Sequence, residues 1–244
     1  MEPQHIKAIV FDADDTLWDC QSHFEVVENQ LYDLLQPWCN REQAAHELFL
    51  TEHANMAALG YGSKAFTLSI LQTALRVSRR EMPQHHIEEL LMAGERLSQL
   101  PGTPLAGVRE TLQTLRHRWL PQQEGRQLVV FTKGELLEQE YKLNRSGLLP
   151  LFDHSVILSN KDEEAYLQLC NQLGIKPSEM LAVGNSFKSD IAPALHIGAS
   201  AIHIPFHVVW QLERSEEFDH ERMVKIACFQ EILAAKFVGF NDFQ

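Results

Sequence analysis

The stretch that decides the fold runs from Ile6 to Trp18 and reads IKAIVFDADDTLW. An almost entirely apolar run is followed by three carboxylates within four positions, at Asp12, Asp14 and Asp15. Such a run is typical of a strand buried on both faces, as in a parallel sheet. The three carboxylates repel one another unless a positive charge lies nearby, and a divalent cation with oxygen ligands is the simplest remedy. The stretch therefore predicts a buried strand that ends at a ligand site.

Further apolar runs, rich in Val, Ile, Leu or Phe, follow along the chain at Leu128–Phe131, Val156–Leu158, Leu181–Val183 and Ala201–Ile204. Helix-like stretches lie between them. Residues Glu135–Ser146 and Asp162–Leu173 carry periodic apolar side chains, and each stretch stops at a glycine. Strands that alternate with helices predict an α/β fold with a doubly wound, Rossmann-like parallel sheet.

The gap between the first two predicted strands is far longer than one crossover and contains no clear strand. Four amphipathic patterns in it predict a helical unit inserted after the first strand. Asn40 and Gln43 have the spacing of a capping box at the start of the second helix. We expect Ser63 to cap the third helix and Pro83 to open the fourth.

The domain organisation follows from this insertion. Residues 1–18 and 101–244 are expected to form the α/β core, and residues 19–100 a helical cap. In the tail, Lys225–Phe229 is a candidate for an added strand and Gln230–Phe237 for a helix.

Composition excludes several classes of protein. The 244 residues include 21 basic and 33 acidic ones, a net charge of −12, and an acidic surface repels nucleic acid. The N-terminal apolar run is too short for a signal peptide or a membrane span. Four cysteines lack CxxC spacing, which disfavours a zinc site and predicts reduced, mostly buried thiols. We expect a cytoplasmic protein whose partner is a small molecule, with neither nucleic acid nor membrane involved; the sequence leaves the oligomeric state open.

Polar residues stand directly after the other predicted strands. Thr132 and Lys133 follow the second strand, Lys161 follows the third, and Asn185 follows the fourth, with Asp190 shortly beyond. The carboxyl ends of parallel strands meet at one edge of a sheet. Hydroxyl and lysine groups at such an edge suit an oxyanion, so an anion site beside the aspartates is predicted.

In this order, the polar residues resemble the four motifs of the haloacid dehalogenase-like hydrolases. That family's first motif is Asp-x-Asp-x-Thr after a hydrophobic strand, as at residues 12–16. Thr132 matches the Ser/Thr of the second motif, and Lys161 the lysine of the third. Gly184-Asn185 with Asp190 resembles the acidic fourth motif. The long helical insert resembles the family's cap domain.

The resemblance implies a phosphatase with defined roles for these residues. Asp12 would be the nucleophile and form an aspartyl-phosphate. Asp14 would protonate the leaving oxygen and then deprotonate water. Thr132, Lys133 and Lys161 would bind the phosphoryl group and neutralise its charge. The substrate would be a small phosphorylated metabolite, and sugar phosphates, nucleoside monophosphates, phosphoglycolate and flavin mononucleotide all stay open.

The resemblance also implies Mg²⁺ as the cofactor. In the family the ion takes the carboxylate at position 12, the backbone carbonyl at position 14 and an acid of the fourth motif. This chain departs from the pattern, because Asn185 stands at the first acidic position. The candidate metal ligands are therefore Asp12, Asp14, Asn185 and Asp190.

Substrate choice in this family depends largely on the cap. Tyr61 and Lys64 lie on a glycine-containing turn between two predicted cap helices, where they are candidates to contact the leaving group. A plain surface loop is the alternative interpretation. His207 and Trp210, which leave the sheet at the same edge, are candidates to line the pocket.

Three other functions stay open. Metal-independent 2-haloacid dehalogenases have an asparagine in the fourth motif, as at Asn185, but they lack an acid corresponding to Asp14. Phosphomutases begin with the same four motifs. A non-catalytic binding or regulatory relic of the fold is the third possibility.

Overall fold

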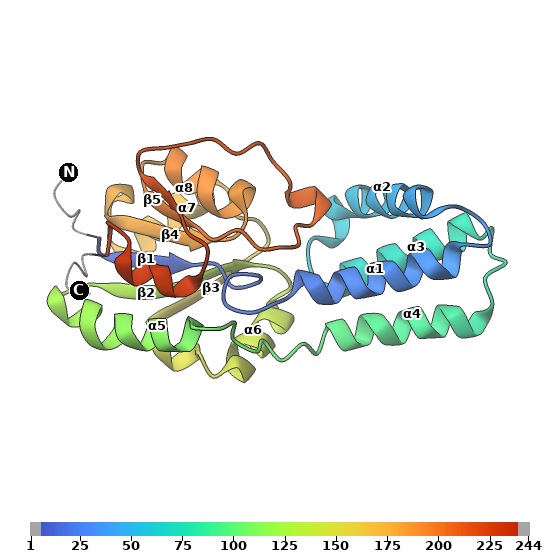
Figure 1. Ribbon diagram of the computed structural model, residues 1–244, viewed down its shortest axis with the longest axis horizontal. Helices are drawn as coiled ribbons and strands as arrows, with labels where there is room; N and C mark the ends of the chain where they lie inside the picture. Colours follow the sequence, from blue (N-terminus) through green and yellow to red (C-terminus); the bar gives the residue numbers. More distant parts are fainter. Residues whose placement is uncertain (1–5, 239–244) are drawn as a thin grey trace.

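The computed structural model describes residues 6–238 and confirms the predicted α/β class (Figure 1). Parallel strands form one sheet in the order β3-β2-β1-β4-β5-β6. Their bounds are β1 Ala8–Phe11, β2 Gln127–Lys133, β3 His154–Leu158, β4 Met180–Gly184, β5 Ser200–His203 and β6 Met223–Lys225. The first five strands overlap the five predicted runs, with β1 at the centre of the sheet between β2 and β4.

Both faces of the sheet are covered, which explains why its strands are apolar throughout. Along β1, Ile9 and Phe11 belong to one core cluster, whereas Ala8 and Val10 belong to the opposite one. The helices that pack on the two faces, or lead up to the sheet edge, are α5 Val108–Thr114, α6 Leu136–Ser146, α7 Glu163–Leu173 and α8 Ala192–His196. Residues of α5 and α6 join the first cluster, and those of α7 and α8 join the second. This arrangement is the doubly wound sheet that the alternating pattern predicts.

Short 3₁₀ and π segments complete the core. Their bounds are η1 Leu115–Trp119, η2 Leu120–Gln122, η3 Leu149–Leu151, η4 Pro177–Glu179, η5 Phe187–Ile191, η6 Gln211–Glu213 and η7 Phe229–Ala234. Of these, η5 and η6 lie at the carboxyl edge of the sheet and contribute to the pocket described below.

A separate helical bundle extends from the sheet along the long axis of the molecule (Figure 1). It consists of α1 Gln21–Leu35, α2 Arg41–Leu59, α3 Ser63–Val77 and α4 Gln84–Leu97. These helices enclose their own apolar cluster, which includes Leu31, Leu48, Ile70 and Leu90. The division of the chain into residues 1–18 with 101–244 and residues 19–100 stays our proposal.

The two chain segments that connect the bundle to the core lie side by side. Trp18 forms a β-bridge with Pro104, and the Leu105 amide donates to the Leu17 carbonyl at 2.9 Å. The inserted helices therefore leave and re-enter the core at one point.

Of the three predicted helix starts in the bundle, two agree with the structure and one does not. The capping box is confirmed, because Asn40 Oδ1 accepts from the Gln43 amide at 2.9 Å and Gln43 Oε1 from the Asn40 amide at 3.2 Å. Pro83 directly precedes α4, as expected. The expectation that Ser63 caps α3 is wrong: Gly62 is the N-cap, and Ser63 Oγ donates to Glu138 on α6 at 2.9 Å. Ser63 faces the core rather than the start of its own helix.

The tail differs from its predicted form. The added strand β6 ends at Lys225 instead of beginning there, and η7 is a 3₁₀ segment that ends at Ala234. The reason is a spacing of three among Ile226, Phe229, Ile232 and Ala235, which all enter one core cluster. A three-residue period is that of a 3₁₀ helix.

Only part of the cysteine expectation is met. All four thiols are free of disulfides; Cys20 and Cys170 are buried, Cys39 is half-buried and Cys228 is exposed. Within residues 6–238, no helix combines the length and apolar character that crossing a membrane requires.

Candidate active site

The carboxyl ends of the strands place most of the predicted site residues around one cavity of about 150 Å³. Asp12, Thr132, Lys133 and Asn185 line it from the ends of β1, β2 and β4, and Asp190 lines it from η5. The opposite wall comes from the helical bundle. Thr132 is 3% exposed, so the hydroxyl lies at a largely enclosed end of the cavity.

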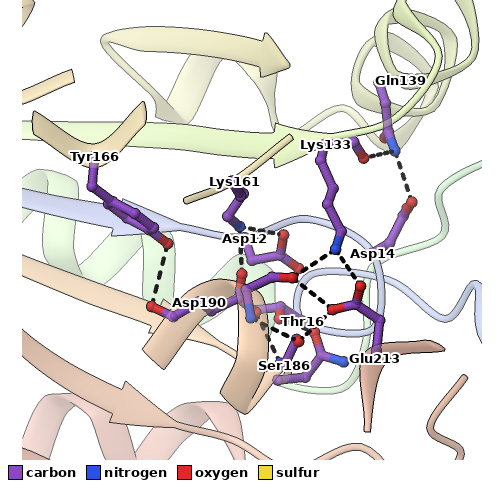
Figure 2. Close-up of polar contacts among 12 residues, drawn as sticks. Asp12, Asp14, Thr16, Lys133, Gln139, Lys161, Tyr166, Ser186, Asp190 and Glu213 are labelled. Carbon is purple, nitrogen blue, oxygen red and sulfur yellow. Dashed lines mark hydrogen bonds and ion pairs between the residues drawn. The ribbon is translucent and has the colours of Figure 1, made fainter. Parts of the chain in front are cut away.

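Lys161 joins two buried carboxylates at this edge (Figure 2). Its Nζ lies 2.8 Å from Asp12 Oδ1 and 2.5 Å from Asp190 Oδ1. Burial lowers the pKa of Lys161, but Asp12 and Asp190 outweigh burial and hold it well above its usual value. Burial and then repulsion from Asp190 raise the pKa of Asp12 to about 7, against the attraction of Lys161. One cation thus serves two acids, and the cluster carries an excess of negative charge.

Asp190 is held tightly against the end of β4. The Ser186 amide donates to Asp190 Oδ2 at 2.9 Å. A Cβ at position 184 would collide with the Asp190 carboxylate, so Gly184 is required by this close approach. The glycine of the resembled fourth motif therefore has a packing role here.

Asp14, two residues after Asp12, has a different environment. Lys142 Nζ lies 2.6 and 2.8 Å from its two carboxylate oxygens, Gln139 Nε2 donates to Oδ2 at 2.7 Å, and Trp18 Nε1 donates to Oδ1 at 2.6 Å. Burial raises the pKa of Asp14, but these three partners outweigh it and lower the value. Asp14 is therefore held as the carboxylate.

Sequence reasoning missed Lys142 and Gln139. The apolar residues of α6 predict a buried face through Leu136, Leu137, Tyr141 and Leu143, yet of these only Leu143 is buried. The opposite, polar face is buried, because it supplies partners to Asp14 and to the helical bundle. The three-residue spacing of Gln139 and Lys142, on the helix after a strand that ends at the site, is the signal that could have identified them.

Asp15, the third carboxylate of the opening motif, serves mainly to start α1. Its Oδ1 accepts from the amides of Cys20 and Gln21 at 2.8 and 2.9 Å. Its φ of 63° lies in the left-handed region, which aspartate adopts more readily than most residues. Burial raises the pKa of Asp15 to about 7.

Asn185 presents a neutral oxygen at the cavity. Thr16 Oγ1 donates to Asn185 Oδ1 at 3.1 Å. The oxygen groups of the predicted metal site that line the cavity include the carboxylates of Asp12 and Asp190 and the amide of Asn185. Hard oxygen donors with excess negative charge suit Mg²⁺, so the residues present fit that ion.

Lys133 is already paired within the chain. Its Nζ donates to Ser189 Oγ at 2.6 Å and lies 2.5 Å from Glu213 Oε1 (Figure 2). Glu213 also accepts from the hydroxyls of Ser186 and Ser189, at 2.7 and 2.6 Å. Burial raises the pKa of Glu213, but Lys133 and the hydroxyls outweigh it. Glu213 lies in η6, after a long loop without periodicity, so no sequence pattern marks it.

The predicted contacts from the bundle are brought together only in part. Tyr61 lines the cavity, with Lys133 Nζ 4.4 Å from its ring centre and the Trp210 ring at 5.8 Å. Trp210 lines it too, as expected. Lys64 is not among the lining residues; its Nζ lies 3.1 Å from Glu135 Oε1, where the bundle meets the core. His207 likewise does not line the cavity and instead contacts α1.

Comparison with known proteins places this geometry in a family. A family model of haloacid dehalogenase-like hydrolases matches residues 6–198. Glyceraldehyde 3-phosphate phosphatase of Methanothermobacter thermautotrophicus is 24% identical over 209 residues, which cover 81% of this chain and 84% of that protein.

Solved structures agree with the match. A haloacid dehalogenase-like family hydrolase from Xanthomonas campestris is 28% identical, with a TM-score of 0.80 over 93% of this chain and 88% of that one. A predicted phosphoglycolate phosphatase from Haemophilus somnus (16% identical, TM-score 0.59, 94% and 97% covered) shares the fold. So does an L-2-haloacid dehalogenase from Xanthobacter autotrophicus (16%, 0.59, 94% and 98%). Since the family model spans most of the chain and the motif residues meet at one sheet edge, this chain belongs to the haloacid dehalogenase-like hydrolases.

Proposed function

We propose that this hydrolase is a Mg²⁺-dependent phosphatase that acts on a small phosphorylated metabolite through an aspartyl-phosphate on Asp12. The observation that carries the proposal is the second carboxylate, Asp14, which lines the same cavity as Asp12 and has three hydrogen-bonding partners of its own. Hydrolysis of a phosphate ester through a phosphorylated carboxylate needs an acid that protonates the leaving oxygen and a base that activates water, both beside the nucleophile. The phosphatase named among the relatives supports the same reaction class.

In the first step, Lys161 holds Asp12 Oδ1, and we assign Oδ2 as the atom that attacks phosphorus. The bond between phosphorus and the leaving oxygen breaks, and a proton from Asp14 passes to that oxygen. The Thr132 hydroxyl and Lys161 stabilise the charge on the phosphoryl oxygens.

In the second step, Asp14 takes a proton from water, which attacks phosphorus and releases phosphate and the Asp12 carboxylate. Lys142 favours the ionised form of Asp14, and this form is the base that the second step uses. The first step needs the protonated form. Asp14 must therefore take up a proton before the first step, and Lys142 opposes this protonation.

Asp12, Asp190 and Asn185 would hold the Mg²⁺, together with the Asp14 backbone carbonyl that the family resemblance implies. Bound Mg²⁺ supplies positive charge that neutralises the incoming phosphoryl group. The raised pKa of Asp12, which burial and Asp190 cause, indicates an uncompensated negative charge that a cation would remove.

A metal-independent dehalogenase is the second candidate, and Asn185 is the observation that favours it. The deciding experiment measures phosphate release from an aryl phosphate, with Mg²⁺ and with chelator, beside chloride release from 2-chloropropionate. We expect phosphate release that depends on Mg²⁺ and no chloride release. Chloride release without metal, and no phosphate release, would contradict the phosphatase.

A further inference from the structure

Beyond its phosphate end, the cavity continues into the helical bundle and becomes mostly apolar. Its apolar lining here is Phe24, Met56, Ala65, Phe66, Val208, Val209 and Trp210, and the polar side chains of Asn55 and Ser69 lie among them. They come from α1, α2, α3 and the loop after β5. A leaving group that fills this part suits an apolar chain or ring next to its phosphate, because most of the lining side chains cannot form hydrogen bonds with it.

Among the described acids of the bundle helices, Glu52 alone lines the cavity. Glu52, on α2, is 7% exposed and reaches the cavity wall. Its Oε2 accepts one hydrogen bond from Trp210 Nε1 at 3.3 Å. No lysine, arginine or histidine in the described part of the chain forms an ion pair with it. A buried carboxyl without a cation takes up a proton instead of staying charged. A cation brought from outside the chain would hold Glu52 as the carboxylate and form a charge-assisted contact with it.

A second acid makes this end of the cavity more negative. Glu28, on α1, repels Glu52, and burial together with this repulsion raises the pKa of Glu52 to about 8. Tyr32 Oη donates to Glu28 Oε2 at 3.5 Å, which leaves the Glu28 charge uncompensated. A neutral hydrogen-bond donor on the ligand would satisfy Glu52 but leave the repulsion, whereas a cation relieves both.

We propose that the substrate is a phosphomonoester whose leaving group carries an amine, joined to the phosphate through an apolar segment, and that Glu52 binds this ammonium. The inference rests on the proposed phosphatase function and names its substrate class. Glu52 is a specificity residue that touches the leaving group and takes no part in the reaction at phosphorus.

The test compares n-alkyl phosphates with ω-aminoalkyl phosphates of the same chain length, over a series of lengths. We expect wild-type kcat/KM at the best length to favour the amine by roughly tenfold or more, the scale of one charge-assisted hydrogen bond. Equal kcat/KM for both series at every length would overturn the inference. This wild-type comparison needs no variant and therefore does not depend on how any variant folds.

Three variants separate the charge from the contact with Trp210. Glu52→Gln keeps an acceptor for the Trp210 indole and loses the charge, so we expect the amine preference to fall to within about twofold of unity. Trp210→Phe keeps an aromatic ring at this position but removes the hydrogen bond to Glu52, and we expect the preference for the amine to persist. Glu42→Gln, an exposed acid on the same helix, is the matched control and should also retain it. A preserved preference in Glu52→Gln would contradict the role of its charge.

Failure of the two proposals gives different results. If neither series nor an aryl phosphate is hydrolysed, the phosphatase function fails and the substrate class falls with it. If alkyl phosphates are hydrolysed without any amine preference, only the inference about Glu52 fails.

Discussion

The two ends of the cavity differ in how their carboxylates are balanced. At the strand ends, acids pair with lysines: Asp12 and Asp190 with Lys161, Asp14 with Lys142, and Glu213 with Lys133. At the bundle end, Glu28 repels Glu52, and the Trp210 indole donates a hydrogen bond to it. No lysine among the described residues pairs with Glu52. The strand ends therefore suit an anion accompanied by a metal, and the bundle end suits a cation. Under our two proposals, this difference in charge would orient the substrate along the cavity.

The largest expected effect comes from removing the acid that we assign as nucleophile. Asp12→Asn should lower kcat at least about a thousandfold, because covalent catalysis contributes several kcal/mol to the barrier. Steady-state phosphate release measures this loss, and an unchanged thermal melting curve is the control. A variant that keeps more than about a tenth of wild-type kcat would exclude the covalent mechanism.

The next effect concerns Lys142, the buried lysine of α6 that pairs with Asp14. Lys142→Met leaves the Asp14 carboxylate without its cation and should cost about 3 kcal/mol of unfolding free energy. The matched control is Lys64→Met, which breaks a pair that is 61% exposed on the lysine side and should cost less than about 1 kcal/mol. Urea denaturation measures both free energies of unfolding. Equal losses in the two variants would contradict the larger contribution that we expect from the buried pair.

The pair of Asp14 and Lys142 also predicts how the stability of the fold depends on pH. The pKa of Asp14 in the folded chain is below its usual 3.8, so the pair stabilises the fold at neutral pH. This stabilisation is lost as the pH falls through the folded value. Urea midpoints should therefore drop more steeply below about pH 4 in wild type than in Lys142→Met. Parallel pH curves would show that Asp14 is not held in the ionised form.

A smaller effect is expected from changing one ligand of the proposed Mg²⁺ than from removing the ion. Chelator should abolish phosphate release, and added Mg²⁺ should restore it. Asn185→Asp adds one charged ligand and should lower the Mg²⁺ concentration for half-activity by roughly tenfold. If Asp190 alone supplies the charge of the fourth motif, Asn185→Asp should change little, whereas Asp190→Asn should raise the Mg²⁺ concentration for half-activity sharply. Full activity of wild type in excess chelator would contradict both outcomes.

The smallest effect separates two side chains of one turn. Tyr61→Ala should lower kcat/KM severalfold for a substrate that reaches the bundle and less for a small aryl phosphate, because Tyr61 lines the cavity. Lys64→Ala should leave both values within about twofold, since Lys64 pairs with Glu135 instead. An equal loss on both substrates in Tyr61→Ala would indicate a structural role for its ring.

The fold and the strand-end part of the site could be predicted from the sequence because their signals are local. A buried strand is a short apolar run, and Asp12 and Lys161 stand directly after such runs. Parallel connectivity then brings their side chains together without any further information.

The remaining site residues are set by tertiary packing. Glu213 reaches Lys133 only because the loop after β5 folds back over the sheet edge. Lys142 and Gln139 are buried on a helix where all the large apolar side chains except Leu143 face outward, so amphipathic periodicity indicates the wrong face. Glu52 lies in α2 among other polar residues, and only the packing of α2 against the Trp210 loop distinguishes it.

The neighbouring connections at Trp18 and Pro104 have a consequence for how substrate choice can change. An insert whose two ends lie side by side can change in length without moving the strands, because the core fixes only the distance between those ends. Its contacts with the core beyond the junction, such as Ser63 with Glu138, would have to change with it. Trp18 also donates its indole hydrogen to Asp14 at 2.6 Å. Trp18 thus belongs both to the junction and to the surroundings of Asp14, so a changed insert would have to keep this residue while its contacts to the proposed leaving group vary.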